Sequence, residues 1–89
     1  MFIVIEHEVT DVKVFWETAQ AGVGNLPSNL KLHQVFPSND SAKAICLWEA
    51  ATLEEVRDFV EGQLGQVSEN TYFAVAEESA LGLPVTAQA

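Results

Sequence analysis

The chain has 89 residues, a length that corresponds to one small domain. Hydrophobic residues make up 48% of the sequence and are spread evenly, which is typical of a globular core and excludes a disordered chain. Thirteen acidic residues against four scattered basic ones give a net charge of −9, so we expect neither nucleic acid nor an anionic membrane surface as a partner.

The location of the protein is predicted from what the sequence lacks. No apolar run approaches the roughly 20 residues that span a bilayer, and the first residues have neither the basic region nor the long apolar region of a signal peptide. The single cysteine, Cys46, cannot form an internal disulfide, which fits a reducing compartment. We therefore expect a cytoplasmic protein without a membrane partner.

The first predicted strand, Phe2–Val9, leads into an amphipathic helix. Thr10 or Asp11 is expected to cap this helix, because a short polar side chain can accept a hydrogen bond from the first free backbone N–H groups. Gly22 and Gly24 are expected to end it. The residues at the 3.6-residue period of a core-facing stripe are Val12, Phe15, Trp16, Ala19 and Val23.

Two strands follow, over residues 30–36 and 41–49. The sequence between them, residues 37–40 (PSND), is a concentrated turn signal, so the two strands are expected to pair antiparallel. The second of them contains a run, residues 42–48 (AKAICLW), that is mostly apolar on both alternating faces, as is the run at residues 1–5 (MFIVI). Strands of this kind need cover on both sides and are expected at the centre of a sheet.

The clearest helix in the sequence starts at Thr52. Thr52 and Glu55 form the pattern of a capping box, in which the two residues satisfy each other's backbone N–H groups. The apolar stripe of this helix is Leu53, Val56, Val60 and Leu64, and Gly65 is its expected end. A fourth strand is predicted over residues 70–77, and residues 79–89 form a weakly patterned tail with a proline at Pro84.

The resulting order of elements is βαββαβ. This order predicts an α+β ferredoxin-like domain over residues 1–78, with a four-stranded antiparallel sheet and two helices on one face. The first and third strands are expected to lie centrally and parallel to each other. Two helices cover only one face of such a sheet, so the other face needs a partner. We therefore expect a sheet-to-sheet homodimer with a shared interior, since self-association also enlarges the thin core of a small domain.

Three segments resemble the dimeric α+β barrel group of ferredoxin-like proteins. They are residues 44–50 (AICLWEA), the capped helix at 52–59 and residues 70–73 (NTYF). More narrowly, they are similar to small uncharacterised bacterial proteins of that group, which also contains antibiotic-biosynthesis-type monooxygenases and muconolactone-isomerase-like enzymes. The order of elements matches over about residues 1–78. The resemblance implies the fold and the dimer; it implies no catalytic residue and no cofactor.

Alternation divides the central strands into two faces. Branched aliphatic residues pack well under helices, so Ile3, Ile5, Ile45 and Leu47 are expected to face the helices. The other set would then line the barrel interior: Phe2, Val4, Glu6, Ala44, Cys46 and Trp48. We expect a small apolar molecule to bind in that interior. The predicted ligand-binding residues are Phe2, Val4, Cys46, Trp48 and Tyr72.

Two alternative functions are compatible with the polar residues near these strands. The first is a cofactor-independent monooxygenase- or isomerase-like enzyme, in which Glu6 or His33 removes a proton from the substrate. The lesser alternative is transition-metal binding by His7 and His33, although no metal-ligand spacing is present. Cys46 is expected to have a structural role, because burial among apolar neighbours makes a thiol unreactive.

Overall fold

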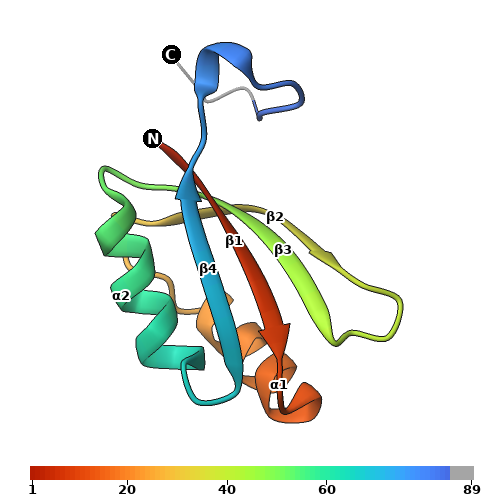
Figure 1. The fold of residues 1–89 in the computed structure, drawn as a ribbon. Coiled ribbons are helices and arrows are strands. Elements are labelled where there is room, and N and C mark those ends of the chain that lie inside the picture. Colours follow the sequence, from red (N-terminus) through yellow and green to blue (C-terminus); the bar gives the residue numbers. More distant parts are fainter. Residues whose placement is uncertain (85–89) are drawn as a thin grey trace.

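A computed structural model describes residues 1–84 of the chain. It consists of one four-stranded sheet and two helices, followed by a short 3-10 turn (Figure 1). The elements are β1 Phe2–Val9, α1 Val12–Val23, β2 Lys31–Pro37, β3 Lys43–Glu49, α2 Leu53–Leu64, β4 Ser68–Ala74 and the turn Glu77–Ser79. Among these residues, no helix is both long and apolar enough to cross a bilayer.

The strand order in the sheet is β2-β3-β1-β4, and all three neighbouring pairs are antiparallel. This order confirms the ferredoxin-like α+β fold and the central positions of the first and third strands. The expectation that these two strands are parallel is wrong, because β1 pairs antiparallel with β3. The tight turn between β2 and β3 reverses the chain direction, so β3 runs opposite to β2 and to β1.

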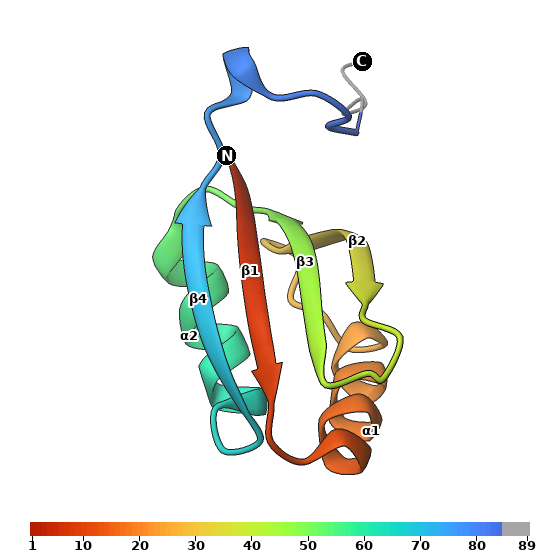
Figure 2. The ribbon, with the colours of Figure 1, turned by 45° about the vertical axis from the view of Figure 1, so that its right-hand side comes forward.

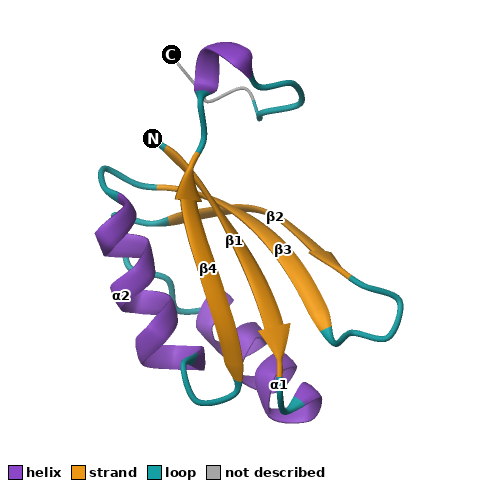
Figure 3. Ribbon diagram, viewed as in Figure 1, coloured by secondary structure: helices purple, strands orange, loops and turns teal. Residues whose placement is uncertain are grey.

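Both helices lie on the same side of the sheet (Figures 2 and 3). The register between β1 and β3 places Ile3 opposite Trp48 and Ile5 opposite Cys46. All four side chains belong to the core cluster, together with Phe15 of α1 and the buried stripe of α2. The side of the sheet that carries these residues is the helix-facing side.

The predicted division of the faces is half correct. Ile3 and Ile5 face the helices, but Ile45 and Leu47 do not. Residues directly opposite in an antiparallel pair share a face, and Ile45 lies opposite Glu6 while Leu47 lies opposite Val4. Ile45 and Leu47 therefore belong to the outer face, the side of the sheet away from the helices, which also carries Phe2, Val4, Glu6, Phe36 and Phe73.

Three strands have bounds that differ from the prediction. β2 is shifted by one residue, to Lys31–Pro37 instead of residues 30–36. β3 begins at Lys43 instead of residue 41, because Ser41 has a φ of 62°, in the left-handed region outside extended geometry. β4 spans Ser68–Ala74 instead of residues 70–77. The last backbone hydrogen bond on this side runs from the Val75 N–H to the Phe2 oxygen, and the backbone of Met1 pairs with Ala50 instead of with β4. The last five residues of the predicted tail, 85–89, lie outside the described residues.

The helix caps follow the sequence closely. Asp11 caps α1 by accepting a hydrogen bond from the Val14 N–H at 3.1 Å. Thr52 caps α2 in the same way, with the Glu55 N–H as donor at 3.2 Å. The predicted capping box is only half formed, because the Glu55 carboxylate accepts hydrogen bonds from Asn29 Nδ2 and from the Thr52 hydroxyl. In place of the second hydrogen bond of the box, the hydrogen bond from Asn29 to Glu55 connects the loop before β2 with α2.

The substitution Val60→Asp is expected to unfold the protein. Val60 is 2% exposed at the centre of the buried stripe of α2, and an unpaired charge there costs several kcal/mol, comparable with the whole stability of a small domain. Thermal melting followed by circular dichroism would measure the loss. Gln63→Asp, at an exposed position of the same helix, is the control and should melt within a few degrees of the wild type. Equal melting temperatures of the two variants would contradict the placement of Val60 on the core-facing side of α2.

Candidate ligand-binding cavity

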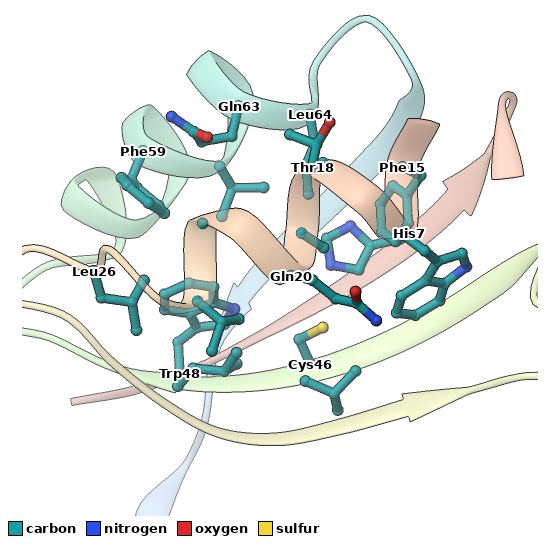
Figure 4. A pocket seen from close by; sticks show the side chains of 17 residues that line it. His7, Phe15, Thr18, Gln20, Leu26, Cys46, Trp48, Phe59, Gln63 and Leu64 are labelled. Atoms are coloured by element: carbon teal, nitrogen blue, oxygen red, sulfur yellow. The ribbon is translucent and has the colours of Figure 1, made fainter. Parts of the chain in front are cut away.

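A cavity of about 320 Å³ lies between the two helices and the sheet (Figure 4). Its floor includes Cys46 and Trp48 of β3, and its walls come from both helices. The helix residues that line it include Phe15, Trp16 and Ala19 of α1 and Phe59, Val60 and Leu64 of α2. Among the described residues that line this cavity there is no Asp, Glu, Lys or Arg.

His7 brings an imidazole ring to the wall of this cavity. It lies on the helix-facing side of β1, opposite Ala44 of β3, and is 3% exposed. Its ring packs edge-on against Phe15 with ring centroids 5.3 Å apart. The Nδ1 atom lies 2.6 Å from Oδ1 of Asn70, the residue opposite it on β4. Backbone register and a side-chain hydrogen bond together fix the position of the ring.

Glu61 of α2 determines which atom of Asn70 meets His7. The Asn70 Nδ2 group donates to Oε2 of Glu61 at 3.0 Å, so Oδ1 is the atom that faces the imidazole. A carbonyl oxygen only accepts hydrogen bonds. The Nδ1 atom of His7 therefore carries the proton and donates it, and in the neutral ring Nε2 has a free lone pair. The Tyr72 hydroxyl donates to the same Glu61 oxygen and helps to hold the carboxylate.

The titration behaviour of this group follows from burial and hydrogen bonding. Burial lowers the pKa of His7, although the hydrogen bond with Asn70 and the charge of Glu61 act in the opposite direction. Hydrogen bonds from Tyr72 and Asn70 lower the pKa of Glu61, so this carboxylate stays ionised at neutral pH. Burial raises the pKa of the Cys46 thiol to about 12, which keeps it protonated and unreactive. At neutral pH the cavity wall is therefore uncharged.

Trp48 contributes a second polar atom beside the cavity. Its Nε1–H group is buried and has no hydrogen-bond partner among residues 1–84. A buried donor without a partner costs about 1–3 kcal/mol of desolvation. By contrast, the other indole, Trp16, donates to the backbone oxygen of Ser41 at 3.2 Å. The donor of Trp48 is thus a buried group that the fold leaves without a partner.

The structure brings together only part of the predicted ligand-binding set. Cys46 and Trp48 line the cavity, but from the helix-facing side instead of a barrel interior. Phe2 and Val4 lie on the outer face. Tyr72 lies on the helix-facing side of β4 and packs against the core, and its hydroxyl is bound to Glu61.

The predicted catalytic candidates lie away from the cavity. Glu6 is an exposed residue of the outer face. The Nε2 atom of His33 lies 2.8 Å from Oε1 of Glu49, and its ring is 5.5 Å from that of Phe2. His33 and His7 are thus on opposite faces of the sheet, so they cannot hold one metal ion within a subunit. Within residues 1–84 no group of three potential metal ligands comes together.

Sequence reasoning did not identify His7 as the polar residue of the cavity. The signal was present, because His7 has the same parity along β1 as Ile3 and Ile5, which were expected to face the helices. Its partners Asn70 and Glu61 could not be inferred, since they depend on the register of β4 and the placement of α2.

Comparison of the chain with models of protein families, with curated proteins and with solved structures found no match. The βαββαβ order and the four-stranded antiparallel sheet are those of a ferredoxin-like fold.

The lowered pKa of His7 predicts a pH-dependent stability. The unfolded chain takes up a proton at His7 near pH 6.5, whereas the folded protein does so only at lower pH. Stability should therefore fall as the pH drops below about 6.5, by up to about 1.4 kcal/mol per pH unit. Urea unfolding across this range would measure the slope. In the His7→Gln variant the slope of stability against pH should be smaller over this range. The other shifted group of the network, Glu61, has a lowered pKa and affects stability only in more acidic solution. An equal slope in both proteins would contradict a buried neutral His7.

Proposed function

We propose that this protein binds a small apolar molecule in the cavity between its helices and its sheet. The observation that carries this proposal is the cavity itself, about 320 Å³ in volume and bounded mainly by aliphatic and aromatic side chains. This volume lies within the range of known ligand pockets, about 300–1,000 Å³. The two helices contribute the polar residues Thr18, Gln20 and Gln63 to its lining.

Filling the cavity should block binding. Ala19 lines the cavity from α1. The substitution Ala19→Leu is expected to weaken the binding of a neutral apolar probe, N-phenyl-1-naphthylamine, by about 5- to 100-fold, because relieving the steric overlap of the larger side chain with the probe costs about 1–3 kcal/mol. Fluorescence titration would measure the dissociation constant. Ala21→Leu, at an exposed position of the same helix outside this cavity, is the matched control. Wild-type affinity in Ala19→Leu, or no saturable binding to the wild type, would refute the proposal.

We further propose that a second copy of the chain covers the outer face. Phe36 and Ile45 are paired across β2 and β3 and are 60% and 47% exposed. Phe73 of β4, also 47% exposed, lies opposite Val4. With Val4 of β1, these residues give each of the four strands an apolar side chain on the outer face, and we call them the apolar band; Glu6 lies beside it, opposite Ile45. A two-fold axis places such a band on itself, and exposed apolar residues gathered on one face are typical of interaction surfaces.

Sedimentation equilibrium would test this homodimer. Ile45→Glu should shift the equilibrium to monomer without unfolding the chain, because the position is already half exposed. Val14→Glu, at a 41% exposed valine of α1, should leave the dimer intact. Added salt should strengthen association, since two chains with a charge of −9 repel each other. A monomeric wild type, or a dimer unchanged by Ile45→Glu, would contradict the proposal.

A cofactor-independent enzyme using Glu6 or His33 is the second candidate function. Both residues lie on the outer face, so this alternative requires the homodimer to enclose them. The pairing of His33 with Glu49 beside the Phe2 ring is the observation that favours it. A cytoplasmic location is proposed on the basis of the single buried cysteine.

A further inference from the structure

The polar atoms on the sheet side of the cavity are few and fixed. The imidazole of His7 projects into the cavity from β1; Cys46 follows on β3, and Trp48 lies further along that strand (Figure 4). The Nδ1 atom of His7 is engaged by Asn70, whereas Nε2 has no hydrogen-bond partner among the described residues. The sheet side of the cavity therefore presents one free acceptor, while the helix side adds the polar side chains of Thr18, Gln20 and Gln63.

The groups packed around His7 leave its ring neutral. On β4, the Oδ1 atom of Asn70 accepts a hydrogen bond from Nδ1–H of His7, and the Tyr72 hydroxyl donates to Glu61. Glu61 of α2 is the nearby carboxylate, and it contacts Asn70 instead of His7. Cys46 of β3 stays a thiol, and α1 contributes Phe15 and Trp16, which do not titrate. The lone pair of Nε2 is thus directed at whatever occupies the cavity.

We propose that the cavity selects a planar aromatic molecule that bears a hydroxyl group, and that this hydroxyl donates a hydrogen bond to Nε2 of His7. This inference rests on the proposed ligand-binding function and specifies its ligand class. The aromatic rings of Phe15, Trp48 and Phe59 line the cavity and favour a flat ligand. A buried acceptor discriminates against a ligand that leaves it unpaired.

The register gives the ligand an approximate length. His7 lies opposite Ala44, and Trp48 lies four residues further along β3, which separates the two backbone positions by about 13 Å along the strand. A hydroxyl held at His7 therefore directs the ring system toward Trp48. Two fused aromatic rings suit this spacing better than a single ring.

The test compares two probes of nearly equal shape, 2-naphthol and 2-methylnaphthalene. Only the first can donate a hydrogen bond. Calorimetric titration at neutral pH gives the ratio of their dissociation constants in the wild type and in His7→Phe. Relative to 2-methylnaphthalene, 2-naphthol should bind about tenfold more weakly to His7→Phe than to the wild type, as expected for one lost hydrogen bond. His7→Phe should still bind 2-methylnaphthalene.

A second measurement needs no substitution. In the ¹⁵N spectrum of the imidazole, the resonance of the unprotonated His7 nitrogen should shift when 2-naphthol binds and stay in place with 2-methylnaphthalene. Failure of both probes to bind the wild type would overturn the proposed function itself. Binding of both probes with the same ratio in wild type and His7→Phe, or an unmoved nitrogen resonance with 2-naphthol, would overturn only the role of His7.

Asn70→Ala tests the positioning role of Asn70. Without the acceptor for Nδ1–H, the proton distributes between the two ring nitrogens, so the ¹⁵N spectrum should lose its single tautomer and the preference for 2-naphthol should fall several-fold. Glu61→Gln is the conservative control, because its side-chain oxygen can still accept from Asn70. An unchanged tautomer and an unchanged preference in Asn70→Ala would refute this role.

Discussion

The pairing register of β1 with β3 is the constraint on which the rest of this structure depends. It places Ile3 opposite Trp48 and Ile5 opposite Cys46, so the four side chains form one apolar surface beneath the helices. A shift of one residue in the pairing of either strand would turn all of its core-facing side chains to the other face of the sheet. The cavity, the histidine in its wall and the apolar band of the outer face are all consequences of this one alignment.

A network of side chains connects this register to α2. Asn70 accepts from His7 on one side and donates to Glu61 on the other, and the Ser68 hydroxyl lies 2.8 Å from the same Asn70 oxygen. Three elements, β1, β4 and α2, thus meet at one amide. Because an amide both donates and accepts, it connects a neutral imidazole to a carboxylate without placing a charge in the core.

The sequence was sufficient for the architecture and insufficient for the site. The order of elements along the chain, the helix limits and the caps at Asp11 and Thr52 follow from local patterns, which act over a few residues. The relative direction of β1 and β3 depends on pairing between distant segments and was predicted wrongly. The assignment of faces failed because both sets of β3, Ile45 with Leu47 and Cys46 with Trp48, are apolar, and alternation does not say which set the helices cover. Only the packed structure decides this. It buries the large indole under α1 and α2 and leaves Ile45 half exposed.

The unpaired indole of Trp48 makes the protein a reporter of its own cavity. Its N–H group lies in apolar surroundings without an acceptor, and indole fluorescence in such surroundings is emitted at short wavelength. Trp16, half buried and bonded to Ser41, provides a second and more polar emitter in the same chain. Both indoles line the cavity, Trp48 from the sheet and Trp16 from α1, so a molecule that entered it would change the surroundings of both emitters. Occupation of the interior can therefore be read from the intrinsic fluorescence of the chain.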